Sequence, residues 1–80
     1  MANKFDLQNW LIEALKEYGG RATIVEVCKY IWQHYEDELR NSNDLFYTWQ
    51  YDIRWAATEL RRQGIMCDAK SCPQGLWILC

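Results

Sequence analysis

The stretch from residue 48 to residue 66 constrains the fold of this chain more than any other part of the sequence. Its apolar residues recur three, four and seven positions apart, which is the spacing of one face of an α-helix. They are Trp49, Ile53, Ala56, Ala57 and Leu60. Thr48 can cap the start of a helix, and Gly64 can adopt the left-handed backbone that ends one. The pattern therefore predicts a helix over residues 48–63.

The side of this helix opposite the apolar stripe has an unusual composition. Winding the helix at about 100° per residue places a group of aromatic, arginine and threonine residues there. They are Tyr51, Arg54, Trp55, Thr58 and Arg62. Tyr, Trp and Arg are favoured at binding surfaces, and Arg and Thr also contact phosphates and base edges. Two interpretations stay open: this face binds a partner, or Tyr51 and Trp55 lie against a loop or the N-terminal residues as extra core.

Length and charge limit what the chain can be. Its 80 residues are enough for one domain, spanning residues 1–80. Half of the residues are hydrophobic and five are Trp, so a folded core is expected without metal ions or disulfide bonds. The net charge of −2 excludes a global basic field and restricts nucleic-acid binding to a local patch. Because no secretion signal or run of ~18 apolar residues is visible, a cytoplasmic protein without a membrane partner is expected.

A first helix is predicted near the N-terminus. Residues 5–18 place their apolar side chains on one stripe, and the glycine pair at 19–20 ends this helix. Residues 21–22 leave room for a short extended piece. Thr23 and Glu26 then have the spacing of a capping box, in which each side chain satisfies a free N–H at the start of a helix.

The helix that starts at this capping box is expected to be the central one. Val25 and Trp32 widen its apolar stripe to one side, so neighbours should cover much of its circumference. Residues 41–44 have the composition of a turn. Residues 45–47 are interpreted as an apolar lead-in to the helix over residues 48–63.

The C-terminal part is predicted to be a β-hairpin. Residues 65–67 and 76–79 are short apolar runs separated by a loop rich in turn residues. A two-stranded hairpin is hardly stable alone, so it must pack against the helices, with Trp77 as the anchor. The expected fold is α+β, with three helices, a short strand after the first, and a small antiparallel C-terminal hairpin.

This order of elements is that of a winged helix-turn-helix domain. Residues 53–66 and 75–79 also resemble the N-terminal winged-helix domain of Mrr-type restriction endonucleases. The shared pattern is Trp-Ala-x-Thr-x-Leu-basic-basic-x-Gly-apolar, which runs from Trp55 to Ile65 here, followed by Gly-x-Trp at the return of the wing. The resemblance covers the second half of the chain, and the first half by helix order. It implies a winged-helix fold and a DNA-recognising role, with Lys70 as the one base at the wing tip.

The resulting hypothesis is duplex DNA binding, with the helix over residues 48–63 as the recognition helix. Its outer face is expected to carry a cluster of Arg without adjacent acids, with Asp52 and Glu59 at the far edge. The candidate DNA-binding residues are Thr48, Gln50, Tyr51, Arg54, Trp55, Thr58, Arg61, Arg62 and Lys70. The alternative is a protein partner, including a second copy of the chain, bound by the same aromatic and arginine face. The low net charge favours the protein partner, and the resemblance favours DNA.

Catalytic and metal chemistry find little support in the Cys and His residues. Cys28 lies within a helical apolar pattern, which favours reduced thiols over a disulfide scaffold. His34 is about 240° around the helix from Cys28, so the two cannot serve one catalytic site unaided. Cys67, Cys72 and Cys80 have spacings that match a zinc site poorly. We therefore expect a binding protein rather than an enzyme, without a cofactor or metal site.

Overall fold

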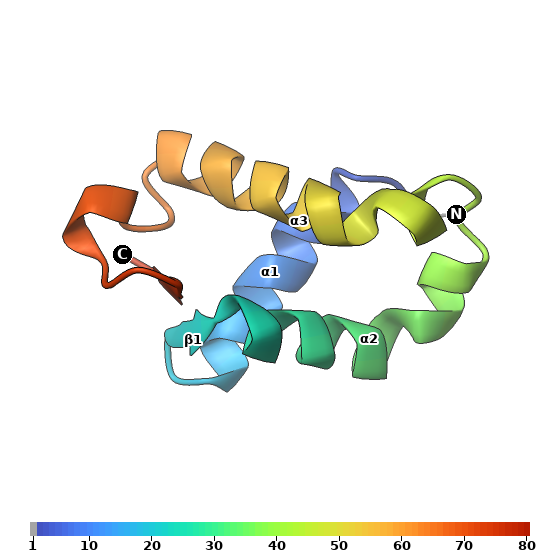
Figure 1. Ribbon diagram of the computed structural model, residues 1–80, viewed down its shortest axis with the longest axis horizontal. Helices are drawn as coiled ribbons and strands as arrows, with labels where there is room; N and C mark the ends of the chain where they lie inside the picture. The colour runs from blue at the N-terminus through green and yellow to red at the C-terminus, as the bar shows by residue number, and fades with distance from the viewer. Residues whose placement is uncertain (1) are drawn as a thin grey trace.

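The structure is a computed structural model that describes residues 2–80. In chain order its elements are α1 (Asp6–Glu17), β1 (Arg21–Thr23), α2 (Ile24–Arg40), α3 (Leu45–Arg62), a 3-10 turn η1 (Ala69–Ser71) and β2 (Leu76–Ile78). Figure 1 shows α2 and α3 along the two long sides of the molecule, α1 passing between them, and the C-terminal segment at one end. The predicted α+β class with three helices is confirmed.

The strands form a two-stranded antiparallel sheet that joins distant parts of the chain. β1 pairs with β2, with Ala22 opposite Trp77 at the centre. The predicted C-terminal hairpin is confirmed only in part: β2 pairs with β1 along its whole length, and residues 65–67 meet residues 78–80 through one bridge and two hydrogen bonds. In that segment, Met66 contributes only an isolated bridge to Leu79.

The chain after α3 still reaches β2 at this one point. The Cys67 N–H donates to the Ile78 carbonyl at 2.9 Å, and the Leu79 N–H donates to the Gly20 carbonyl at 2.8 Å. Because the Ile78 carbonyl and the Leu79 N–H point to opposite edges of the strand, the end of β2 lies between the start of β1 and the segment around Cys67. The chain then turns into η1, so the pairing stops after a single bridge.

Most helix ends lie where the sequence predicts them. The Thr23 hydroxyl accepts from the Glu26 N–H at 3.1 Å, while the Thr23 N–H donates to the Glu26 carboxylate at 2.9 Å. This confirms the predicted capping box at the start of α2. Gly64 follows the last turn of α3 with a φ of 81°, the left-handed conformation that glycine adopts without steric cost.

The start of α3 differs from the prediction. The helix begins at Leu45, so the apolar lead-in is its first turn and Thr48 lies inside the helix. The Thr48 hydroxyl donates to the Asp52 carboxylate at 2.8 Å instead of capping the helix. The physical reason is burial: Leu45 is only 7% exposed and lies one turn before Trp49, so it extends the buried stripe.

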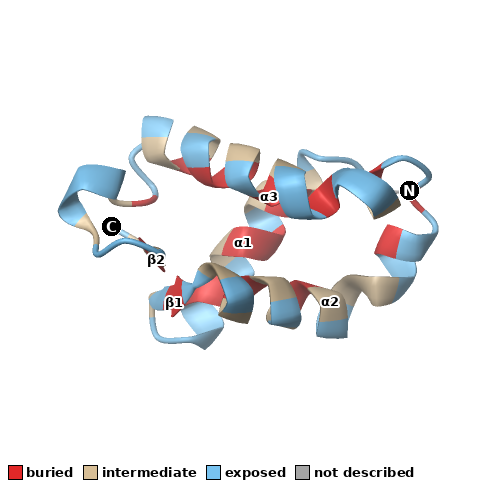
Figure 2. Ribbon diagram, in the orientation of Figure 1, coloured by how far each residue is buried: buried red, intermediate tan, exposed pale blue. Residues whose placement is uncertain are grey.

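The core lies where the three helices meet. Figure 2 shows the buried sides of α2 and α3 turned toward the space through which α1 passes. The whole apolar stripe predicted for α3 is buried. The sheet end is closed by Ala22, Met66 and Trp77, and Trp77 is only 5% exposed, which confirms its predicted role as the anchor.

Candidate nucleic-acid interface

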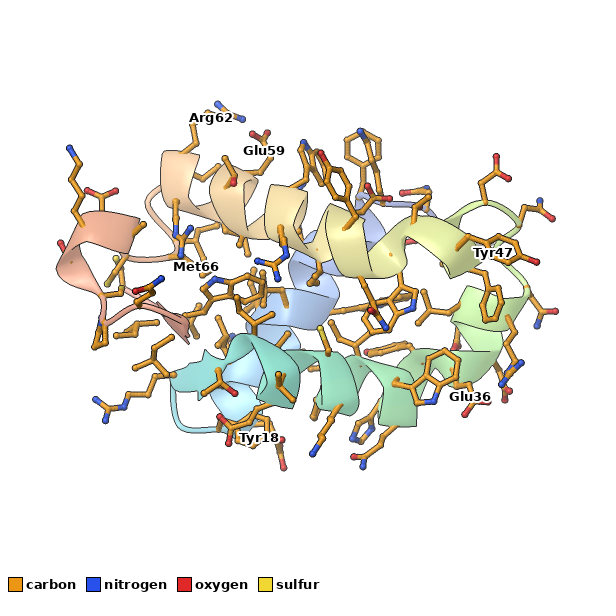
Figure 3. All side chains as sticks on the ribbon, in the orientation of Figure 1. Tyr18, Glu36, Tyr47, Glu59, Arg62 and Met66 are labelled. Carbon is orange, nitrogen blue, oxygen red and sulfur yellow. The ribbon has the colours of Figure 1, made fainter. Side chains whose placement is uncertain are left out.

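Exposed residues follow one another along the whole length of α3, on the side that faces away from the core. Tyr47 and Tyr51 are 83% and 75% exposed. Arg54, Thr58 and Arg62 continue the same face and are also exposed. We call these residues, Tyr47, Tyr51, Arg54, Thr58 and Arg62, the outer face of α3. Figure 3 shows Tyr47 near the start of the helix and Arg62 near its end.

Arg62 forms an ion pair within the helix. Its Nη2 and Nε groups donate to the two carboxylate oxygens of Glu59 at 2.9 and 3.2 Å. This pair lowers the pKa of Glu59 and raises that of Arg62. Figure 3 shows the two side chains next to each other at the outer side of α3. The predicted cluster of Arg without adjacent acids is therefore wrong at Arg62, because i,i+3 neighbours meet on a helix surface.

Trp55 belongs to the extended core rather than to the exposed face. The Phe5 ring meets it edge to face, with centroids 5.5 Å apart, and the Lys4 ammonium lies 4.6 Å from the centroid of the Trp55 ring. Trp55 is half-buried as a result, whereas Tyr51 is exposed. The interpretation as extra core therefore applies to Trp55, which N-terminal residues cover. The interpretation as a binding surface stays open for Tyr51, which is exposed.

One edge of α3 carries cations and faces α2 and the C-terminal segment. Arg61 is half-buried, and its Nε donates to the Cys67 carbonyl at 3.3 Å, which ties α3 to the chain that follows it. Among residues 2–80, Arg54 forms no ion pair. Burial raises the pKa of the Cys28 thiol, and the Arg54 guanidinium partly offsets this rise, so Arg54 acts on a residue of α2.

A groove of about 820 Å³ separates this edge of α3 from α2. Its lining is mainly apolar and includes Cys28, Trp32 and Trp49. The charged residues that line it are Lys29 and Arg54, both cations. Val25 also lines the groove and is 62% exposed, so neighbours cover α2 less completely than the sequence predicts. The groove was not predicted, although it is lined by Val25 and Trp32, the two residues that widen the apolar stripe of α2 in the sequence.

The segment between α3 and β2 holds the remaining predicted DNA contact. Lys70 lies exposed in η1 and forms no ion pair among the described residues. Arg61, Ala69 and residues 72–77 line a hollow of about 230 Å³ next to it. Since Arg61 and Arg54 are seven residues apart on one edge of α3, the structure places Gln50, Arg54 and Arg61 in one row that leads toward this segment.

The thiols and the histidine lie in separate places. Cys28 lines the groove, and Cys72 lines the hollow beside Arg61. The Sγ atoms of Cys67 and Cys80 are 2.8 Å apart. His34 stacks on Tyr30 one turn away, with ring centroids 4.1 Å apart. Over residues 2–80, no three His, Cys, Asp or Glu side chains come together in a way that could hold a metal ion.

Comparisons with known proteins add no assignment. A scan against protein-family models, a search of curated proteins and a search of solved structures each gave no match. Of the helices in the described chain, none has the length and apolar character needed to cross a membrane. The resemblance to the Mrr-type winged-helix domain stays a hypothesis that rests on the residues of α3 and β2.

Proposed function

We propose that the protein binds duplex DNA, with the outer face of α3 in the major groove and the segment around Lys70 beside the phosphate backbone. The observation that carries the proposal is the exposure of Tyr51, Arg54 and Thr58 along the middle of α3. A helix followed directly by a short β-paired segment is the arrangement in which winged-helix domains present their recognition helix. Arg and Thr side chains on such a face can contact base edges and phosphates.

The charges around α3 make this binding weak and dependent on salt. Arg62 is paired with Glu59, and Arg61 is half-buried and donates to the Cys67 carbonyl, so the phosphate contacts that we propose are Arg54, Lys70 and, across the groove, Lys29. Two or three phosphate contacts give a slope of about −2 to −3 for the logarithm of affinity against the logarithm of salt.

The experiment is a fluorescence-anisotropy titration of a mixed-sequence duplex at ~20 mM salt, where the electrostatic contribution to binding is large. Arg54→Ala should weaken binding several-fold. Lys16→Ala is the matched control, because it removes the same charge from α1, where Lys16 lies near Glu13 and Glu17 rather than near α3. Equal losses in both variants would show that only net charge matters and would argue against the proposed face.

The groove between α2 and α3 favours a second candidate function, which is binding of a protein. Its apolar lining and the exposed Val25 are typical of a surface that a partner covers. A second copy of the chain is the partner that can be tested directly. Light scattering across a concentration series should show a dimer for the wild type and a monomer for Val25→Glu. A monomer for both would remove this candidate.

A further inference from the structure

Two thiols meet at the end of the sheet. The Cys80 thiol donates a hydrogen bond to the Cys67 sulfur, with the Sγ atoms 2.8 Å apart. A disulfide bond is about 2.0 Å long, so the two sulfur atoms need to approach by only roughly 0.8 Å to form one. All four cysteines are free thiols in the structure.

The backbone holds these two residues beside each other. The Met66–Leu79 bridge lies between them, and the Cys67 N–H donates to the Ile78 carbonyl at 2.9 Å. The Cys80 N–H donates to the Ile65 carbonyl, also at 2.9 Å. Because side chains alternate across a pair of strands, Cys67 and Cys80 emerge on the face opposite Met66, which is buried. The proximity of the thiols is therefore a property of the strand pairing.

The two thiols differ in how accessible they are. Cys80 is exposed and Cys67 is half-buried. An exposed thiol next to a less accessible one is the arrangement in which the first reacts with an oxidant and the second resolves the product. The other two cysteines lack such a partner at this distance among residues 2–80: Cys28 lines the α2–α3 groove and Cys72 the hollow beside Arg61.

We propose that Cys67 and Cys80 form a dithiol site that small disulfides such as oxidised glutathione convert to an intramolecular disulfide. The Cys80 thiolate attacks one sulfur of oxidised glutathione and breaks its S–S bond. The product is a mixed disulfide, and the released glutathione thiolate takes up the proton that Cys80 lost. The Cys67 thiolate then attacks the Cys80 sulfur and releases the second glutathione. The protein loses two hydrogen atoms, and oxidised glutathione is reduced to two glutathione molecules.

The disulfide would join the two ends of the segment that carries Lys70. Residues 68–79, with η1 and β2, lie between the two cysteines. Closing a loop of this length reduces the freedom of the unfolded chain, so the melting temperature should rise by roughly 5–15 °C. A reductant should reverse the rise.

The test combines intact mass, thermal melting and peptide mapping after incubation of the reduced protein with oxidised glutathione. The wild type should lose about 2 Da and melt at a higher temperature. Cys67→Ser should instead retain one glutathione on Cys80 and show no rise. Cys28→Ser is the matched control and should behave as the wild type does.

Peptide mapping in a Cys72→Ser background identifies the bond. Trypsin cleaves after Arg62 and Lys70, which leaves Cys67 in residues 63–70 and Cys80 in residues 71–80. These two peptides should be joined only after oxidation. The proposal is overturned if the wild type loses no hydrogen, if the peptides stay separate in this background, or if Cys67→Ser still shows the rise in melting temperature.

Discussion

Glu59 holds Arg62 in a two-point ion pair, with its carboxylate oxygens 2.9 and 3.2 Å from Nη2 and Nε of the guanidinium. The pair determines how much positive charge α3 offers to a phosphate. We expect Glu59→Gln to release Arg62, to strengthen DNA binding several-fold, and to make the salt slope more negative by roughly one. Salt-dependent anisotropy titrations measure both quantities.

Asp52→Asn provides the control for this variant. It removes the same charge from the same edge of α3, but its partner is Thr48 rather than an arginine. It should raise affinity slightly and leave the slope unchanged. If both variants change the slope equally, the Glu59–Arg62 pair does not limit DNA binding.

The hydroxyl of Tyr35, whose ring stacks on Trp10, should make the free energy of unfolding depend on pH. The rings are parallel at 4.2 Å, and the Tyr35 hydroxyl donates a hydrogen bond to the Glu13 carboxylate. This hydrogen bond, with burial and the Glu13 charge, raises the pKa of Tyr35 to about 12 from its ordinary value of 10.0. The folded state therefore keeps this proton where the unfolded state has lost it. The resulting stability is fully present below pH 10 and is lost as the pH rises through 12.

Urea unfolding at a series of alkaline pH values measures this effect. Tyr35→Phe has no hydroxyl to ionise, so its free energy of unfolding should fall less steeply than that of the wild type over this range. Identical slopes for the two proteins would contradict the assigned hydrogen bond.

Trp77 should be among the most costly residues to truncate. It is 5% exposed and lies opposite Ala22 at the centre of the sheet. Trp77→Ala should lower the free energy of unfolding by about 3–5 kcal/mol, since it leaves a cavity where the sheet closes the core. Tyr47→Ala, at an 83% exposed position, should change it by less than about 0.5 kcal/mol. Chemical denaturation distinguishes the two, and comparable losses would contradict the placement of Trp77.

Two threonines test where the helices begin. Thr23→Ala removes the capping box of α2 and should cost about 1 kcal/mol. Thr48→Ala should cost less than about 0.5 kcal/mol, because Thr48 lies inside α3 rather than at its start. A larger loss at Thr48 than at Thr23, measured by urea unfolding, would support a helix that begins at Thr48.

The parts of the fold that could be predicted from the sequence depend on local spacing. The stripe around Ile53 and the capping box at Thr23 are patterns within a few residues, and both are present in the structure. The start of α3 was missed because Leu45 carries no capping signal, and only its burial shows that it belongs to the helix. The main partner of β2 was missed because β1 is three residues long and lies far earlier in the chain, with Ala22 55 positions before its partner Trp77 and the only apolar residue of β1.

The features of the candidate site also fall into two groups, those that follow from local spacing and those that depend on how the helices pack. The pairing of Arg62 with Glu59 is a three-residue relationship that the sequence already contains. The cover that Phe5 places on Trp55 depends on how α1 meets α3, and no spacing within α3 reveals it. Arg61 likewise has its guanidinium directed to Cys67 by the turn at Gly64, which leaves Arg54 as the central cation of the face.

NMR chemical-shift mapping of the protein with a mixed-sequence duplex at ~20 mM salt would locate the DNA-binding surface residue by residue. We expect shifts in the backbone amides of residues 50–62 and of η1 around Lys70, and none in the part of α1 around Lys16. The absence of shifts at any duplex concentration, or shifts confined to Val25 and its neighbours in α2, would contradict DNA binding by α3.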